Sequence, residues 1–221
     1  MFNVYFAGDL FDHKHITGNR ILADYIEKTS QGLYKCILPQ DWEGALNSPV
    51  QIRNKDIQMV AQADCVLFNF DGPDLDSGTV VEFMLAKMLD IPVVLLRTDC
   101  RNGGYLEGED WNLMVLGYPR SIILKHPALM MYNTHGLAET HSIIAQSVIE
   151  GLEQVKKQES LFCSYEEIFA AYQHVIKMCG ANLNGVLPAA LIQEIIVSKI
   201  QKNIYPSYAV HSSFVCNFLS Q

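Results

Sequence analysis

The sequence predicts an open, doubly wound α/β sheet of parallel strands, followed by a C-terminal extension of helices. Three observations support this. Short apolar runs alternate with helical patterns over roughly the first 125 residues, and this rhythm is typical of parallel strands joined by crossover helices. The apolar runs are continuous, as in a sheet that is covered on both faces. With 49% hydrophobic and 18% charged residues, the composition fits a globular core.

Each predicted strand is a short apolar run that ends at a turn or at a residue that breaks regular structure. Gly8 follows the first run, Pro39 ends the second, and Gly72 lies just beyond the third. The predicted strands are residues 2–7, 34–38, 65–70, 92–96 and 121–124. Their order and spacing predict a flavodoxin-like or Rossmann-like sheet.

The crossover helices are predicted from apolar residues that recur at helical spacing. In the first of them, Ile21, Leu22, Tyr25 and Ile26 fall on one face. The predicted crossover helices are residues 16–28, 52–62 and 78–89.

The alternation of strands and helices stops near residue 137. Three further helices are predicted at residues 137–157, 165–179 and 188–202, with residues 180–185 as a loop between the last two. We therefore divide the chain into an α/β domain, 1–136, and a helical extension, 137–221. The extension contains no motif to which chemistry can be attached, and we expect it to serve packing or contacts between subunits.

Charge and composition exclude several classes of function. The formal net charge is −8 and no block of Lys or Arg stands out, so a nucleic-acid partner is not expected. The six cysteines form no CxxC pair and no zinc-like cluster with histidines, which favours reduced thiols and predicts no metal. No apolar run is long enough for a membrane span, and the first residues lack a basic leader segment. We expect a cytoplasmic protein without a cofactor.

Ligands of doubly wound sheets bind beyond the carboxyl ends of the strands, and here these ends are rich in carboxylates. Gly8 and Asp41 lie at the ends of the first two predicted strands, and residues 71–76 follow the third. We predict that these segments border the substrate site.

The predicted helix after the third strand carries one charged residue in an apolar stretch. Between Thr79 and Ala86, Glu82 is the only charge, and apolar residues surround it on every side of the helix. A helix that is apolar all round is expected to be buried, and burial raises the pKa of a carboxyl group. Glu82 is thus a candidate for nucleophilic or acid–base chemistry, the alternative being a structural cap or an ion pair in the core. Asp76, six residues earlier, suits the N-cap of the same helix.

Four segments resemble the nucleoside 2-deoxyribosyltransferase family over roughly residues 2–125. Asp76-Ser-Gly78-Thr-Val-Val-Glu82 is similar to the catalytic-helix motif Asp-x-Gly-Thr-x-x-Glu, and Asn112-Leu-Met114 is similar to an Asn-Leu-Met motif. The other two segments are residues 4–8, similar to the opening strand, and residues 52–57, similar to the second-helix motif.

The resemblance implies a role for each matching residue. Glu82 corresponds to the nucleophile, and Tyr5 to a tyrosine that orients it. The positions that correspond to groups contacting the nucleobase are Asp76, which also supports proton transfer, Asp56 and Glu43. The substrate-binding positions are completed by Gly8, Asp41 and Gly78, and by Asn112 and Met114, which a neighbouring subunit inserts into the sugar site. The resemblance therefore implies at least a homodimer.

The chain departs from the family pattern in two places. Phe83 and Met84 stand where the family commonly has small residues after the nucleophile, which puts substrate preference in doubt. The helical segment after about residue 137 is longer than in compact members of the family.

The expected reaction breaks the N-glycosidic bond of a 2′-deoxynucleoside through a covalent deoxyribosyl–Glu82 intermediate and transfers the sugar to another nucleobase. The expected partners are therefore small deoxynucleosides and free bases. One alternative is an N-glycosidase, which hydrolyses a nucleoside or nucleotide with water as acceptor. Two others are a non-catalytic nucleotide-binding module on the same fold and a flavodoxin-like redox or receiver domain.

Overall fold

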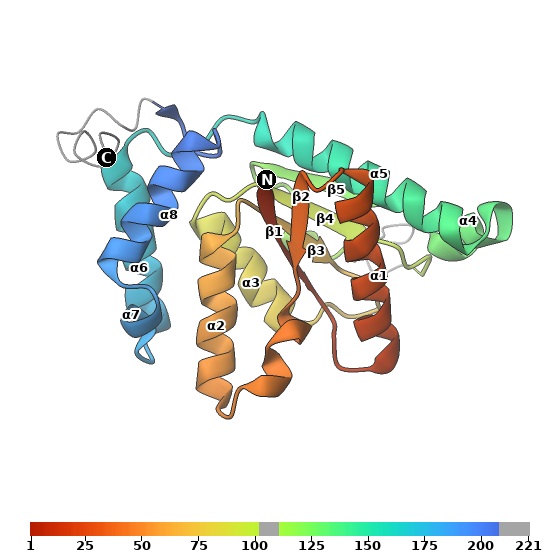
Figure 1. Ribbon diagram of the computed structural model, residues 1–221, viewed down its shortest axis with the longest axis horizontal. Helices are drawn as coiled ribbons and strands as arrows, with labels where there is room; N and C mark the ends of the chain where they lie inside the picture. Colours follow the sequence, from red (N-terminus) through yellow and green to blue (C-terminus); the bar gives the residue numbers. More distant parts are fainter. Residues whose placement is uncertain (102–110, 208–221) are drawn as a thin grey trace.

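A five-stranded, all-parallel sheet forms the centre of the computed structural model, which describes residues 1–101 and 111–207 (Figure 1). The strands are β1 (Phe2–Gly8), β2 (Tyr34–Ile37), β3 (Cys65–Asn69), β4 (Val93–Arg97) and β5 (Ser121–Lys125). Their order in the sheet is β2-β1-β3-β4-β5. The predicted fold class is confirmed, in its flavodoxin-like form.

The strand order reverses between β1 and β3, which are neighbours in the sheet. Chain connections from β1 and β3 leave toward opposite faces, and ligands of such folds bind at this switch point. At its carboxyl end, Gly8 of β1 pairs with Asn69 of β3. A β-carbon at Gly8 would lie 3.2 Å from both the Cβ and the main-chain oxygen of Asn69, so glycine allows this close pairing.

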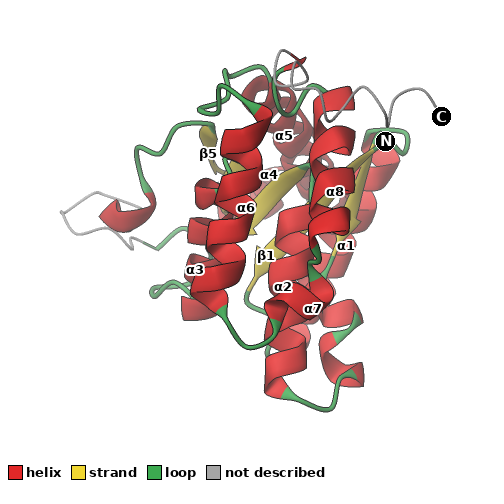
Figure 2. Cartoon of the chain, turned by 90° about the vertical axis from the view of Figure 1, so that its left-hand side faces the viewer, coloured by secondary structure: helices red, strands yellow, loops and turns green. Residues whose placement is uncertain are grey.

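Helices cover both faces of the sheet. Helices α1 (His13–Thr29) and α5 (Leu137–Lys156) pack against each other on one face, and α2 (Pro49–Gln62) and α3 (Ser77–Met88) on the other (Figures 1 and 2). The inner strands β1, β3 and β4 are almost entirely buried, which explains their continuous apolar runs, whereas the edge strands β2 and β5 are partly exposed.

Three C-terminal helices form a further layer outside α2 and α3. They are α6 (Tyr165–Cys179), α7 (Leu183–Val186) and α8 (Ala189–Gln201), and α7 contacts α2 while α6 contacts α3 (Figure 2). Helix α5 instead belongs to the layers around the sheet. The domain boundary at residues 136/137 stays a prediction.

Main-chain carbonyl groups of this outer layer accept hydrogen bonds from α2. Arg53 donates to the oxygen of Cys179 at 2.7 Å, and Asn54 donates to that of Ala181 at 2.8 Å. Gln58 donates to the oxygen of Val186 at 2.9 Å. Three polar side chains of α2 thus hold the segment around α7 in place.

A buried polar cluster joins the outer layer to the end of α2. The ammonium group of Lys199, which is 1% exposed, donates to the carbonyl of Ala61 at 2.8 Å and to the hydroxyl of Tyr172 at 2.9 Å. Burial lowers the pKa of Lys199 to about 7. Nearby, Lys202 pairs with the carboxylate of Asp64 at 2.7 Å.

The structure corrects two local expectations. Helix α4 (Ala128–His135) follows β5 where no element was expected, and α7 begins at Leu183, within the segment predicted as a loop. Both are short, with eight and four residues, and hydrophobic periodicity over so few residues does not distinguish a helix from a loop. Of the helices in the described part of the chain, none is long and apolar enough to cross a membrane.

Candidate active site

Glu82 on α3 and Tyr5 on β1 meet where the helix crosses the strand. The phenol of Tyr5 donates a hydrogen bond of 2.5 Å to Oε1 of Glu82. Tyr5 is 0% exposed because β1 lies inside the sheet, between β2 and β3. The two residues are 77 positions apart in sequence and are brought together by the fold. A fixed phenol thus orients the carboxyl group.

The pKa of Glu82 is raised to about 8: burial raises it most, the charges of Asp56, Asp76 and Glu43 also raise it, and the hydrogen bond from Tyr5 lowers it. The pKa of Tyr5 is raised well above its ordinary value by burial and by the charge of Glu82, so Tyr5 keeps its proton. We call Glu43, Asp56, Asp76 and Glu82 the acid cluster. Of the four, Glu82 has a pKa above neutral pH.

Asp76 is the N-cap of α3, as predicted. Its Oδ2 accepts from the main-chain N–H of Thr79 at 2.7 Å and from the Thr79 hydroxyl at 2.8 Å. Gly78 lies in the first turn, and a β-carbon there would lie 3.2 Å from the same Oδ2. The Asp-x-Gly-Thr pattern thus has a local structural reason, since the glycine and the threonine both accommodate the capping carboxylate.

Asp56 on α2 is held by a residue that the sequence did not point out. The indole Nε1–H of Trp42 donates to Oδ1 of Asp56 at 2.8 Å. Trp42 lies between η1 (Pro39–Asp41) and η2 (Glu43–Ala45), and its ring is tilted against that of Tyr5 with centroids 6.4 Å apart. Burial raises the pKa of Asp56 to about 6. A lone tryptophan in a polar loop gives no pattern from which this contact could be predicted.

Glu43, in η2, is partly buried at the edge of the cluster. Burial raises its pKa, and the charge of Asp76 raises it further. The structure therefore brings together five of the predicted residues: Tyr5, Glu43, Asp56, Asp76 and Glu82.

Asp41 has a different neighbourhood. Its side chain is exposed and pairs with Arg20 of α1. Gly8 closes β1 against β3 at the switch point, as described above. The assignment of Gly8, Asp41 and Gly78 as substrate-binding positions stays a prediction.

The expectation that α3 is buried all round is wrong. Val81 is 59% exposed and Met84 is 38% exposed, whereas Phe83 is fully buried against Phe68 and Tyr118. The sheet and α2 cover only part of a helix surface, so the apolar residues on the far side of α3 lie open in the described part of this chain.

Asn112 and Met114 border another exposed apolar segment. Asn112 accepts from the main-chain N–H of Met114 at 2.9 Å and begins η3 (Leu113–Val115). Leu113 is 55% exposed and Met114 is 66% exposed. The segment is connected to α3 through the edge-to-face contact of Tyr118 with Phe83. Exposed apolar side chains at this density are typical of a surface that contacts another protein.

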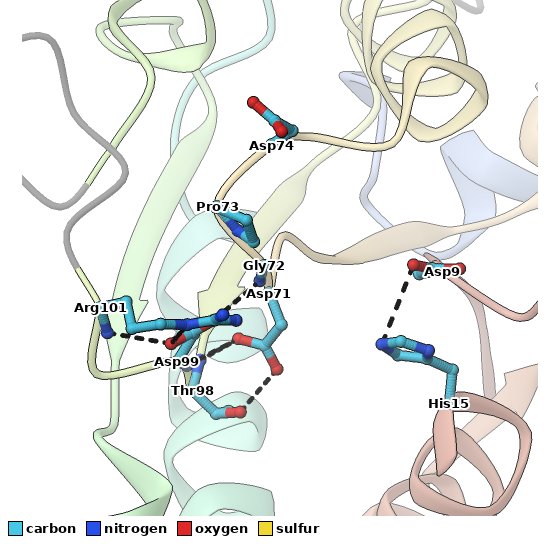
Figure 3. A pocket seen from close by; sticks show the side chains of 9 residues that line it. All are labelled: Asp9, His15, Asp71, Gly72, Pro73, Asp74, Thr98, Asp99 and Arg101. Carbon is cyan, nitrogen blue, oxygen red and sulfur yellow. Dashed lines mark hydrogen bonds and ion pairs between the residues drawn. The ribbon is translucent and has the colours of Figure 1, made fainter. Parts of the chain in front are cut away.

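A cavity of about 480 Å³ opens at the carboxyl ends of β1, β3 and β4 (Figure 3). In Figure 3, Asp9 and His15 face the turn at residues 71–74 and the segment Thr98–Arg101 across this space. Asp71 accepts from the N–H and the hydroxyl of Thr98 at 2.5 and 2.6 Å. The turn that precedes α3 is therefore tied to the end of β4. The acid cluster is not among the described residues that line this cavity.

Asp99 fixes the same turn from the other side. It accepts from the N–H of Gly72 at 3.1 Å and pairs with the guanidinium of Arg101 at 2.5 Å. Across residues 1–101 and 111–207, no group of three or more His, Cys, Asp or Glu side chains is arranged to hold a metal ion.

A family model for nucleoside 2-deoxyribosyltransferase matches residues 4–115, about half of the chain. A conserved protein from Enterococcus faecalis V583 is similar at 23% identity, with a TM-score of 0.46, over 70% of this chain and 98% of its own. A 2-desoxiribosyltransferase from Leishmania mexicana is similar at 20% identity, with a TM-score of 0.47, over 62% of this chain and 100% of its own. A CMP N-glycosidase from Clostridium botulinum is similar at 12% identity, with a TM-score of 0.46, over 67% of this chain and 98% of its own. No curated protein sequence matches.

Proposed function

Because the chain belongs to the nucleoside 2-deoxyribosyltransferase family, we propose that it transfers 2-deoxyribose between nucleobases, with Glu82 as the nucleophile. The observation that carries this proposal is the 2.5 Å hydrogen bond from Tyr5 to Glu82 inside the acid cluster. A carboxylate held by a phenol can stabilise an oxocarbenium-like sugar and then bond to it.

In the first step, a carboxylate oxygen of Glu82 forms a bond to C1′ of the deoxynucleoside while the bond from C1′ to the base nitrogen breaks. The electron pair goes to the leaving base, which takes a proton from the acid cluster, with Asp76 or Asp56 as the donor. Burial raises the pKa of Glu82 to about 8 and that of Asp56 to about 6, so the proton that Glu82 gives up on becoming the nucleophile can pass through Asp56 to the leaving base.

In the second step, a nitrogen of the incoming base attacks C1′ and displaces the Glu82 carboxylate. The proton of that nitrogen returns to the carboxylate that donated the first one. Two displacements at one carbon give net retention of configuration. No metal or cofactor takes part in this scheme, and a 2′-hydroxyl would crowd the nucleophile, which favours deoxyribose.

We further propose that the working form is at least a homodimer. The open apolar side chains of α3, Val81 and Met84, and those of η3, Leu113 and Met114, support a subunit contact. In such a dimer, Asn112 and Met114 of each subunit complete the sugar site of its neighbour.

The test is a base-exchange assay with paired purine and pyrimidine donors and acceptors, run beside Glu82→Ala and Glu82→Gln. We expect exchange by the native chain, no exchange by either variant, and a mass increase of one deoxyribosyl group on the peptide that contains Glu82 after a rapid quench. Exchange by the variants, or an adduct on another peptide, would remove Glu82 from this role.

The same assay separates the alternatives. Release of free base at an equal rate with and without a second base would make the enzyme a hydrolase. Binding of deoxynucleosides without turnover would favour a non-catalytic nucleotide-binding module.

A further inference from the structure

A second cavity, of about 420 Å³, lies on the face of the sheet that is opposite to the acid cluster. It is bordered by α1, α4 and α5 and by the carboxyl ends of β3 and β4, and we call it the rear pocket. Helix α5 packs against both α1 and α4 (Figure 1). No member of the acid cluster is among the described residues that line the rear pocket. Pockets for small molecules commonly have roughly 300–1,000 Å³, so the rear pocket is large enough for a ligand.

The alternation of side chains along β3 directs Asn69 into the rear pocket. The neighbouring Phe68 contacts Phe83 of α3 edge to face, with ring centroids 5.6 Å apart, so Phe68 projects to the face that carries the acid cluster. Successive side chains of a strand point to opposite faces of the sheet. Asn69 therefore projects to the face covered by α1 and α5, where it lines the cavity.

The carboxamide of Asn69 has no partner in the part of the chain that the structure describes. Its Oδ1 is buried and accepts no hydrogen bond, and no described residue is bonded to its Nδ2. Rotation about the last side-chain torsion exchanges the two atoms, so the group can offer the cavity a donor or an acceptor. Polar groups that stay unpaired inside a protein are rare, so this amide is suited to a partner from outside the chain.

Asn19 of α1 brings a second carboxamide to the same cavity. Asn19 is 6% exposed, and its Nδ2 donates a hydrogen bond of 3.0 Å to the main-chain oxygen of Asp9. This bond fixes the amide, and among the described residues no donor reaches its Oδ1. The rear pocket thus has two amide groups, on two different elements, that can bond to a ligand.

Other polar groups of the rear pocket bond within the chain. Asp71 accepts from the N–H and the hydroxyl of Thr98 (Figure 3), and the hydroxyl of Thr140 donates to the oxygen of Gly136 at 2.7 Å. Much of the remaining wall is apolar or aromatic and includes Leu22, Leu129, Tyr132 and Ile144. Burying a charge without a partner is unfavourable, so these walls favour an uncharged ligand with a flat apolar face.

We propose that the rear pocket binds a free nucleobase, which pairs with Asn69 and Asn19 and lays its ring against Tyr132. A nucleobase is planar and uncharged and carries a donor beside an acceptor along one edge. An asparagine amide has the same pair of groups and can match such an edge with two hydrogen bonds. The identity of the ligand rests on the proposed function, since free bases are the compounds that this reaction consumes and releases. The cavity and its two amides do not depend on it.

Gly18 allows the rear pocket to be filled without disturbing the fold. It lies on α1 at the wall of the cavity, and a β-carbon there would meet nothing within 4 Å. Gly18→Phe therefore places a ring in open space, and it replaces a residue that is unfavourable inside a helix. Gly185→Phe is the matched control, because a β-carbon at Gly185 on α7 also meets nothing within 4 Å and α7 lies in the outer layer beyond α2.

The experiment is photolabelling with 8-azidoadenine, followed by peptide mapping and run beside the base-exchange assay. We expect label on peptides from residues 13–29 or 128–156 in the native chain and in Gly185→Phe, in addition to label near the acid cluster. An excess of adenine should protect both sets of peptides. Gly18→Phe should lose the label of the rear pocket and should keep the other label and base exchange.

Asn69→Leu tests the role of the amide, because leucine has a similar size and lacks both polar atoms. The adenine concentration that protects the rear pocket should rise at least about 10-fold in this variant, since a site that loses its hydrogen-bonding group no longer favours the ligand that pairs with it. Protection of the acid cluster should not change.

The outcomes separate this inference from the proposed function. The inference is overturned if the native chain carries no label in the rear pocket, if Gly18→Phe keeps that label, or if Asn69→Leu is protected at the native adenine concentration. Base exchange by a native chain without this label leaves the proposed function standing. Label in the rear pocket of a chain that exchanges no bases supports the binding site and refutes the transferase proposal.

Discussion

Replacing Tyr5 by phenylalanine removes one hydroxyl from the centre of the proposed site and keeps the ring. The hydroxyl donates the 2.5 Å hydrogen bond to Glu82 and is the contact that favours the ionised form of that carboxyl group. A hydrogen bond to a charged group is worth about 1.5–3 kcal/mol. Since one pKa unit corresponds to about 1.4 kcal/mol, the pKa of Glu82 should rise by roughly one to two units in Tyr5→Phe.

The direction in which the pH dependence of activity changes follows from the protonation state in which Glu82 reacts. In the proposed mechanism Glu82 attacks as a carboxylate, so activity should rise with pH through its pKa, which is raised to about 8. Tyr5→Phe should move this rising limb to higher pH and should lower kcat/KM near neutral pH by roughly 10- to 100-fold. Part of the loss should be recovered as the pH is increased. Tyr5 itself stays protonated across this range because its own pKa is raised.

The assay is base exchange measured from pH 5 to 10, with saturating and limiting donor. Tyr25→Phe is the matched control, since Tyr25 on α1 stacks on His141 and makes no contact with the acid cluster among the described residues. Its pH profile should be that of the native chain. If Tyr5→Phe keeps the native rate and the native rising limb, the phenol does not control Glu82 and the proposed role of the pair is wrong.

Three further changes test other parts of the structure. Gly8→Ala places a β-carbon 3.2 Å from Asn69, so β1 and β3 must move apart. Urea unfolding should show that the free energy of unfolding falls by roughly 1–3 kcal/mol. An unchanged midpoint would contradict the close pairing. Asp76→Ala removes the cap on the N–H of Thr79 and should cost about 1 kcal/mol by the same measurement, whereas Asp76→Asn should restore most of it. In the folded chain the pKa of Lys199 is about 7, below its ordinary value, so the unfolded chain binds more protons between about pH 7 and 10.5. The free energy of unfolding should therefore rise with pH in that window, by up to about 1.4 kcal/mol per pH unit. If Lys199→Met shows a parallel pH profile, this reasoning is refuted.

Much of the α/β part could be predicted because its patterns are long and local. Continuous apolar strands and three crossover helices follow from hydrophobicity alone, and the cap of α3 follows from the residue type of Asp76. Glu82 stood out as one charge in an apolar helix, although the reason given was only partly right, since Val81 and Met84 are exposed. Glu82 is half-buried on the side of α3 that meets Tyr5 of the sheet.

The contacts missed from the sequence join residues that are far apart along the chain or belong to irregular segments. Trp42 reaches Asp56 from a turn between two short 3₁₀ helices, and Arg53 reaches a carbonyl 126 positions away. Such pairs depend on the relative placement of whole elements, which hydrophobic periodicity does not contain. The placement of Asp41 beside Arg20 is of the same kind.

The hydrogen bonds from Arg53, Asn54 and Gln58 to carbonyl oxygens of the outer helices have a practical consequence for protein engineering. Asp56, which the proposed function places beside the leaving base, is carried by the same helix, so these hydrogen bonds also hold the backbone of Asp56 in position. A chain truncated before the outer helices would lose these three hydrogen bonds. Attempts to broaden base specificity should therefore replace side chains of the site and keep the outer helices, which hold the backbone of α2 in position.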